Sequence, residues 1–458
     1  MQQVLNSERL VSLFRDVVLP LADAHAATQA GLRWSAEDAS LVVAGTTLPI
    51  DAFRHIYLVG AGKAGVPMAR AVVDTLEQDR RLWAKFAGGT VNVFREQAKA
   101  VVPRVQFFAA DHPNPNQASV DGARAALALL SAATADDLVI AVISGGGSSL
   151  LTLPQEGICL DAFCAANRVL VTGGATIQEI NTVRKHLSSV KGGRLRMAAS
   201  DALFVTLVLS DVIGDDLSSI ASGPTVPDPT TCPDAIAALT GHGLWGRFPE
   251  SCRSLLLRGD PGEADRAALW RDRLTPRTYN VVVASNAVVL SSLQRLLSSS
   301  QYSAFASEVH LEGSPVTGPV GEAVESHFAH AVALSRPPGA LLLCGGEPLV
   351  SVPPEAHGTG GRMLHYALLA ARRIAGRNWT VLASGTDGID GTSPAAGAVV
   401  TGSTIEVACT HDLDADRYLE AFDSYGFFRE LEVRSGAHFL IVTGPTGTNV
   451  NDIMLWSL

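Results

Sequence analysis

The segment Leu138–Leu151, LVIAVISGGGSSLL, constrains the fold most strongly, because an apolar run of strand length leads directly into three consecutive glycines. The apolar residues Leu138–Ile143 predict a buried strand. A glycine-rich turn at a strand end lets backbone N–H groups gather around an anion, and the serines that follow can cap a helix. A flexible loop is the alternative, but three glycines carry an entropy cost that a simple turn does not require. The residues predicted to form this anion cradle are Ser144, Gly145, Gly146, Gly147, Ser148 and Ser149.

A second predicted strand, Ile56–Val59, also ends in glycines. The hexapeptide Gly60–Gly65 matches the GxGxxG pattern that binds dinucleotides between a strand and a helix, although Arg95-Glu96 stands where a ribose-binding acid would follow the next strand. Lys63 lies inside this turn, next to Gly62, where its charge opposes the dipole of the following helix. This placement favours neutralisation of a phosphate or carboxylate, and a solvated lysine is the alternative.

Carboxylates follow two of the predicted strands. Asp211 comes almost directly after the apolar run Leu203–Leu209. Asp387 and Asp390 lie three residues apart in the glycine-rich segment Ser384–Gly391, which resembles a metal or phosphate loop. Carboxylates at such strand ends suit Mg²⁺ coordination or activation of a hydroxyl. Capping of a turn is the alternative for both, and the spacing is not that of an EF-hand.

A basic group of residues stands out in an acidic chain. Arg184, Lys185, Lys191 and Arg194 lie close in the sequence to Asn181, while His186 is interpreted as structural. We expect Asn181, Arg184 and Lys191 to face a substrate, and a solvated helix face is the alternative.

The C-terminal half repeats the combination of strand, glycine and polar residue. Arg362 follows Gly358–Gly361 at a helix start, where its guanidinium could bind an oxyanion, with a solvated arginine as the alternative. Glu347 follows an apolar strand, and Asn449 lies in the hydroxyl-rich and amide-rich segment Thr443–Asp452. Simple surface turns are the alternative for these two.

Alternating strand and helix patterns predict an α/β fold with parallel sheets, helices on both faces and ligands at the carboxyl ends of the strands. At 458 residues and 47% hydrophobic residues, the chain is long enough for two domains. We expect a domain over residues 1–240, a connection over 241–277 and a second domain over 278–458. An amphipathic helix is predicted over residues 7–31, and later strands over 280–284, 303–309, 340–343, 380–383 and 438–442.

Composition narrows the function classes. A net charge of −10 disfavours nucleic acid and anionic membranes as partners. The chain shows no signal-peptide pattern and no run of about 20 apolar residues. The six cysteines are scattered without a CxxC pair, so we expect reduced thiols in a cytoplasmic protein, with no zinc site implied. Whether the chain forms a homodimer stays open.

Taken in order, these motifs resemble one family, the class II glycerate kinases, which are glycerate 2-kinases with a C-terminal MOFRL domain; some members carry the label hydroxypyruvate reductase. The resemblance covers nearly the whole chain. It rests on VGAGKAGVPMA, DHPNPN, ISGGGSSLL, INTVRKHLSSVKGGRL, LSDVIGDDLSSIASGPTVPDPT, CGGEP, GTGGR, ASGTDGIDGTSPAAGA and TGPTGTNVND.

The resemblance implies phosphorylation of the 2-hydroxyl of D-glycerate with ATP and Mg²⁺. It implies a larger Rossmann-like α/β/α sandwich and a smaller C-terminal α/β domain, with the site in the cleft between them. By resemblance, Lys63 and Arg362 are catalytic, Asp387 and Asn449 lie at the site, and Ser144–Ser149 belongs to a phosphate or nucleotide loop. The chain lacks the GxxxxGK[ST] pattern of a P-loop enzyme.

One departure concerns the residues after Arg362. Family members usually continue with Asn-Gln-Glu, whereas this chain has Met363-Leu364-His365. The change implies either a different small hydroxy acid as substrate or positions that only pack the helix. An NAD(P)H-dependent hydroxypyruvate reductase and a non-catalytic binding protein are the competing hypotheses.

Overall fold

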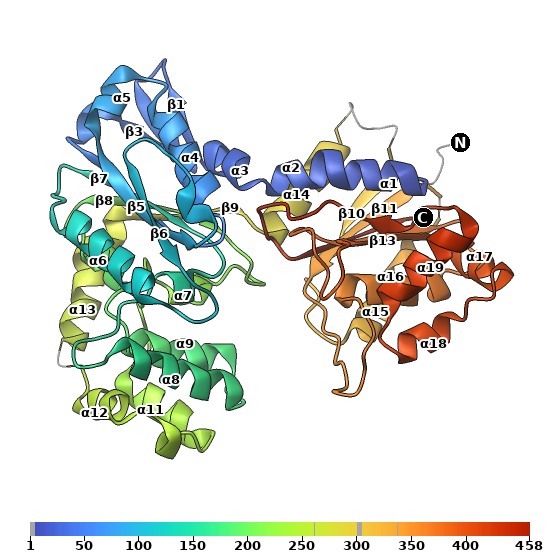
Figure 1. Cartoon of the computed structure of the whole chain (residues 1–458). Helices are drawn as coiled ribbons and strands as arrows, with labels where there is room; N and C mark the ends of the chain where they lie inside the picture. Colours follow the sequence, from blue (N-terminus) through green and yellow to red (C-terminus); the bar gives the residue numbers. More distant parts are fainter. Residues whose placement is uncertain (1–4, 261, 300–304, 337) are drawn as a thin grey trace. The chain divides into compact units, whose positions relative to one another are not determined.

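The computed structural model describes residues 5–260, 262–299, 305–336 and 338–458, and it divides the chain into two compact units (Figure 1). The first unit is Ala24–Val283. The second unit combines the described part of Met1–Asp23 with Ala284–Leu458. An α/β architecture with two domains is therefore confirmed, although the boundaries differ from the predicted ones.

The first unit is built on a six-stranded sheet. Its strand order is β6 (Val105–Ala110), β5 (Phe86–Phe94), β4 (Ile56–Ala61), β7 (Leu138–Ile143), β8 (Leu203–Leu209) and β9 (Thr278–Ala284). The pairs β6–β5, β5–β4, β4–β7 and β7–β8 are parallel, as predicted. From β4 the chain adds strands on one side through β5 and β6, and then on the other side through β7 and β8. The carboxyl ends of β4 and β7 therefore meet at a topological switch point, the usual ligand position in such sheets.

Every residue of β4 and of β7 is buried, which explains their unbroken apolar sequences. Helices such as α4 and α6 lie beside the main sheet, whereas α8, α9, α11 and α12 form a separate group, and an antiparallel three-stranded sheet β1-β2-β3 completes the unit (Figure 1). Their bounds are α3 (Ala24–Gly31), β1 (Leu32–Ser35), β2 (Ser40–Val43), β3 (Thr46–Pro49), α4 (Gly65–Leu76), α5 (Arg80–Lys85), α6 (Gln117–Ser131), α7 (Gly147–Leu150), α8 (Leu160–Thr172), α9 (Ile177–His186), α10 (Arg194–Met197), α11 (Cys232–Gly241), α12 (Glu250–Arg258) and α13 (Glu263–Leu269).

The predicted connection over residues 241–277 is instead part of the first unit. Helix α12 packs in a separate core with α8, α9 and α11 (Figure 1). Leu244, Phe248, Cys252 and Leu256 are buried in this core. The prolines and charges of the segment suggested a linker, but its apolar residues recur at helical spacing and cover the neighbouring helices.

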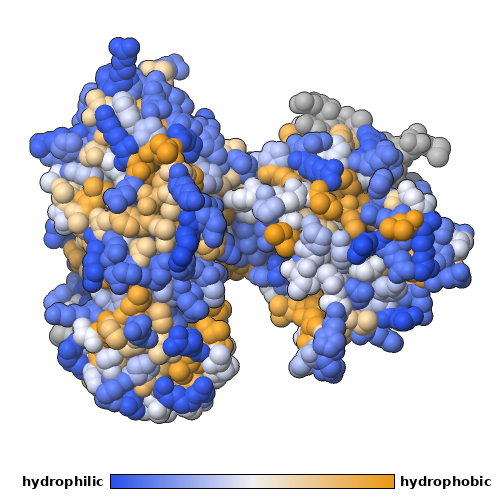
Figure 2. Space-filling view, in the orientation of Figure 1, coloured by the Kyte–Doolittle hydropathy of each residue, from blue (hydrophilic) through white to orange (hydrophobic). Residues whose placement is uncertain are grey.

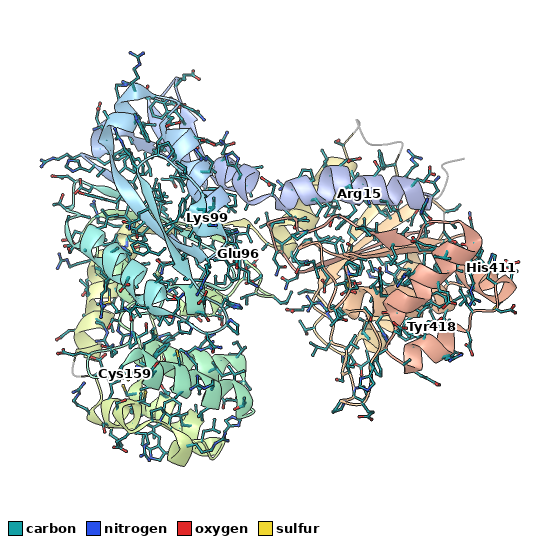
Figure 3. The ribbon with its side chains drawn as sticks, viewed as in Figure 1. Arg15, Glu96, Lys99, Cys159, His411 and Tyr418 are labelled. Atoms are coloured by element: carbon teal, nitrogen blue, oxygen red, sulfur yellow. The ribbon has the colours of Figure 1, made fainter. Side chains whose placement is uncertain are left out.

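The predicted helix over residues 7–31 is broken at Asp23. It consists of α1 (Ser7–Leu13), a π-helical turn (Phe14–Val18), α2 (Leu19–Ala22) and, beyond an extended Asp23, α3. Arg15, labelled in Figure 3, donates from Nη2 to the Val442 carbonyl at 3.2 Å. The backbone N–H of Leu5 donates to Ser457 Oγ at 2.8 Å. The described residues before Ala24 therefore pack with the second unit.

The second unit contains a mixed sheet, which corrects the prediction of a second parallel sheet. Its strand order is β10 (Glu308–Leu311), β11 (Ala340–Gly346), β15 (Asp452–Ser457), β12 (Thr380–Gly385), β13 (Gly397–Thr401) and β14 (Leu440–Ile441). Only β10–β11 is a parallel pair among the described strands of this sheet, and the other four pairs are antiparallel.

The reason is the position of two strands that the sequence did not predict, β13 and β15. β15, the last strand of the chain, lies between β11 and β12. The predicted strand over 280–284 pairs in the first sheet as β9, and of the predicted strand over 303–309, residues 303–304 lie outside the described residues.

Helix α16 (Arg362–Arg373) lies in the core of the second unit, where Met363 and Leu364 are fully buried. The other α-helices of this unit are α14 (Asn286–Leu297), α15 (Val320–Leu334), α17 (Thr404–Thr410), α18 (Ala415–Glu420) and α19 (Ser424–Ser435). On the visible face, hydrophilic residues cover most of each unit and apolar residues form small patches between them (Figure 2). Among the described helices, none has the length and apolar character needed to cross a bilayer.

The N-terminal segment provides a test of the unit boundary. Phe14 is fully buried, so Phe14→Ala should lower the free energy of unfolding of the second unit by about 3–5 kcal/mol. Amide hydrogen exchange should show lost protection in β12 and β13, with β4 and β7 unchanged. Val433→Ala, at a side chain that is 79% exposed in α19, is the control. Lost protection in β4 and β7 would contradict the boundary.

Candidate functional site

The turns after β4 and β7 are joined by hydrogen bonds. The Ser144 N–H donates to the Ala61 carbonyl at 3.0 Å, and the Lys63 N–H donates to the Gly145 carbonyl at 2.9 Å. The Ala64 N–H donates to Ser144 Oγ at 3.0 Å. The two predicted motifs therefore form one structure, with the backbone of Lys63 fixed against the anion cradle.

The glycines of the cradle are required by their neighbours. A Cβ on Gly145 would overlap the carboxylate of Asp211. Gly146 has a φ of +80°, and a Cβ there would lie 3.3 Å from Lys63 Cγ and 3.4 Å from His112 Cδ2. Lys63, Asp211 and His112 therefore border the cradle, and the structure brings the predicted Lys63 and Asp211 together.

Positive charge gathers at this edge of the sheet. Burial, together with the charges of Lys63 and Arg184, lowers the pKa of His112. Burial also lowers the pKa of Arg184, whose Nε donates to Asn167 Oδ1 at 2.9 Å. His112 was not predicted as a site residue, although the motif DHPNPN pointed to its loop.

Lys191 and Asn181 are connected to the cradle by hydrogen bonds. Lys191 is buried, and its Nζ donates to the carbonyls of Ser148 at 2.7 Å and Leu151 at 3.0 Å. Burial lowers the pKa of Lys191 to about 7. Ser222 Oγ donates to Asn181 Oδ1 at 3.1 Å and hydrogen-bonds to Ser148 Oγ at 2.9 Å. Of the two predicted binding residues, Lys191 thus bonds directly to the cradle residue Ser148, and Asn181 is linked to Ser148 through Ser222.

Arg362 forms a network in the second unit. Its Nη1 donates to Glu347 Oε1 at 2.7 Å, and its Nε and Nη2 donate to the two carboxylate oxygens of Asp452 at 2.5 and 3.4 Å. The remaining oxygen of Glu347 accepts from Asn451 Nδ2 at 3.3 Å. The guanidinium is therefore held between Glu347, directly after β11, and Asp452, at the start of β15.

A pocket of about 800 Å³ opens beside this network. Arg362, Asp387 and Asn449 line it together with Asp452. Asp387 Oδ1 accepts from the Ile389 N–H at 3.2 Å. The structure thus brings together the predicted residues of the C-terminal half, with Glu347 bonded to Arg362.

Two further acidic residues line this pocket, Asp390 and Asp452. Asp390 accepts from the N–H groups of Met363 at 3.1 Å and Leu364 at 2.7 Å at the start of α16, and burial raises its pKa to about 6. Burial raises the pKa of Asp452 to about 8, against the opposing effect of Arg362. The sequence pattern predicted Asp390 together with Asp387 as a pair of carboxylates. Asp452 was not predicted, although it ends the polar segment Thr443–Asp452 directly before an apolar run.

The three unusual residues after Arg362 divide into two groups. Met363 and Leu364 are buried in the core, as one interpretation of the sequence expected. His365 lines the pocket instead and stacks on Phe422, with ring centroids 5.6 Å apart and planes 16° apart. Burial lowers the pKa of His365.

The fold and these clusters define an α/β protein of two units, with a basic glycine cradle in one and an acidic pocket around an arginine in the other. Comparison with known families also gives two matching regions in the chain. Residues 13–257 match a domain of unknown function designated DUF4147, and residues 340–452 match the MOFRL family.

Individual proteins are similar over most of their length. Glycerate 2-kinase of Pyrococcus horikoshii is 36% identical, with 91% of this chain and 90% of that protein covered. A protein of Agrobacterium vitis, provisionally named hydroxypyruvate reductase, is 38% identical, with coverage of 86% and 85%. The crystal structure of glycerate kinase from Thermotoga maritima matches with a TM-score of 0.81 and 30% identity, covering 98% of this chain and 100% of that one. The chain belongs to the class II glycerate kinase family.

The buried Lys191 gives a testable pH dependence. Its pKa falls from 10.5 to about 7 on folding, so between these values the unfolded chain binds more protons. The free energy of unfolding should therefore rise from pH 7 to pH 10, by on the order of 4 kcal/mol. Urea unfolding should show that Lys191→Met lacks this rise. Lys99→Met, at an exposed lysine of the same unit (Figure 3), should keep it, and equal slopes in all three proteins would contradict the assignment.

Proposed function

We propose that this chain transfers a phosphoryl group from ATP to the 2-hydroxyl of D-glycerate, giving 2-phosphoglycerate. The observation that carries the proposal is the fixed position of Lys63 against the glycine cradle at the switch point of the first sheet. The glycerate 2-kinase of Pyrococcus horikoshii and the glycerate kinase of Thermotoga maritima support the substrate.

The positive charges near the glycine cradle suit the first unit to phosphate binding. Phosphoryl transfer depends mainly on positioning and on neutralising the charge of the transferred group. The cradle offers backbone N–H groups, and Lys63 and Arg184 add positive charge near it. We assign phosphate binding to the cradle, with Lys63 neutralising the transferred phosphoryl group or the substrate carboxylate.

Arg362 retains donors for a substrate. A guanidinium has five N–H groups, and its contacts with Glu347 and Asp452 use three of them in the part of the chain that the structure describes. Its side chain is about one-third exposed, at 32%, and it lines the pocket. Glu347 and Asp452 hold its orientation, so we assign Arg362 to an oxyanion of the reacting molecules.

The acidic pocket suits a divalent cation. Asp387, Asp390 and Asp452 line the pocket together with Arg362, which also pairs with Glu347. Hard carboxylate oxygens are the ligands that Mg²⁺ prefers. We assign Asp387 to Mg²⁺ in this pocket, with Asp211 beside the cradle as the other candidate. When bound, Mg²⁺ would neutralise charge on the ATP phosphates.

The catalytic assignment is tested by Lys63→Ala and Arg362→Ala. Each should lower kcat by about 10²–10³-fold, because each removes a charge that stabilises the transition state. ADP release with ATP, Mg²⁺ and D-glycerate measures the rate, and NMR of the product gives the phosphorylated position. Lys99→Ala and Arg429→Ala, both at exposed positions, are the matched controls. Activity retained in both site variants would refute the assignment.

The name of the Agrobacterium vitis relative suggests a second candidate function, reduction of hydroxypyruvate by NADH or NADPH. Arg95, in the ribose-binding position after β5, is paired with Asp111 through Nε at 3.1 Å and Nη2 at 2.6 Å, and Glu96 beside it is exposed (Figure 3). We therefore expect no oxidation of NADH or NADPH with hydroxypyruvate, measured at 340 nm by loss of the reduced nicotinamide. Turnover with either nucleotide would restore the reductase hypothesis.

A further inference from the structure

A cluster of potential metal ligands lies in the second unit, outside the Arg362 pocket. Glu312 directly follows β10, His327 lies on α15 and Cys344 lies on β11. One ligand atom from each side chain lies within 4.8 Å of the other two. His330, one helical turn after His327, hydrogen-bonds through Nδ1 to Glu312 Oε2 at 2.6 Å.

His327 carries a buried ring nitrogen without a hydrogen-bond partner among the described residues. The residue is 1% exposed, and the nitrogen is its Nε2. Its Nδ1 is hydrogen-bonded to the Tyr366 hydroxyl at 2.6 Å, and Trp456 Nε1 donates to the same oxygen at 3.0 Å. A buried polar atom without a partner is unfavourable, so this Nε2 calls for an explanation.

We propose that Glu312, His327 and Cys344 form a Zn²⁺ site. A thiolate, an imidazole and a carboxylate are the ligands that Zn²⁺ takes in proteins, and the soft thiolate disfavours Mg²⁺. The thiolate and the carboxylate together balance the charge of the ion, as a buried site requires. Zn²⁺ would bind Cys344 Sγ as its proton leaves to solvent, and a water molecule would complete four ligands.

The surrounding contacts have the form of a supporting shell. In the tautomer with a proton on Nδ1, His327 donates to the Tyr366 oxygen and presents the lone pair of Nε2 to the ion. His330 holds the Glu312 carboxylate. Such outer contacts orient metal ligands. Bonds of about 2.0–2.3 Å place tetrahedral ligand atoms about 3.3–3.8 Å apart, so ligand atoms within 4.8 Å of one another need to close by at most about 1.5 Å.

The site would join three elements of the sheet edge, β10, α15 and β11. Its ligands are far apart in the sequence, at positions 312, 327 and 344, which is why the absence of a CxxC pair argued against zinc. Burial raises the pKa of the Cys344 thiol, so the side chain stays protonated until a cation replaces the proton.

The test uses the full chain, stripped of metal with EDTA and titrated with Zn²⁺ and Co²⁺. We expect one equivalent bound, a thiolate-to-Co²⁺ absorption band and a higher thermal midpoint of the second unit with Zn²⁺. Cys344→Ser should abolish the band. His330→Gln, which removes an outer contact, should weaken binding about 10–100-fold.

Cys409→Ser, at an exposed cysteine of the same unit, is the matched control and should bind like the unchanged chain. Glu312→Gln, at a partly exposed side chain, provides a second test if Cys344→Ser does not fold, and it should also weaken Zn²⁺ binding. Failure to bind one equivalent, or a band that persists in Cys344→Ser, would overturn the proposal. Unchanged affinity in Glu312→Gln would also overturn it.

Discussion

The hydrogen bonds between the turns after β4 and β7 are the contacts on which the site of the first unit depends. β4 and β7 are parallel neighbours, and the chain continues to opposite sides of the sheet after them. The turns that follow the two strands therefore lie next to each other at the same edge of the sheet. A Cβ on Gly62 would overlap Ser144, which ties this close approach to glycine. Lys63 follows immediately, so the position of its backbone is set by sheet topology rather than by its own side-chain contacts.

The second unit orients its arginine by a different means. Arg362 begins α16, and Asp390 accepts from the next two backbone N–H groups, which fixes the start of the helix. Asp452 then holds the guanidinium through two bonds. Burial of this carboxylate makes its charged form unfavourable, and Arg362 is the compensating charge. The position of Arg362 thus depends on β15, which delivers Asp452 to the centre of the sheet.

Local sequence patterns predicted the elements whose signals are local. The strands β7 and β8 match their predicted ranges, and the glycine cradle follows β7 as expected. Pairing between distant strands was not predictable in this way. The residues Ile453–Trp456 are apolar, but nothing in their own sequence indicates that β15 inserts between β11 and β12. The unit boundary at Asp23 has the same origin, since it depends on which sheet the first helices cover.

The candidate site shows the same division. Lys63, Asp211 and the cradle were found as separate motifs, and parallel topology explains why they meet. Asp390 was recognised as a carboxylate of its loop, but its contact with the start of α16 was not predicted, because that partner is distant in the sequence. Asp452 was missed for the same reason, since its partner is the guanidinium of Arg362. His112 was missed because its role depends on its closeness to Gly146 of the cradle, and the sequence of its loop does not encode that contact.

The three residues after Arg362 lie on different faces of α16. Met363 and Leu364 turn into the core, and their side chains do not line the pocket, so their apolar character adds packing beneath Arg362. His365 lies one residue further on and faces the pocket, stacked on Phe422. Of the three side chains, His365 is therefore the one in a position to contact a substrate in this pocket directly.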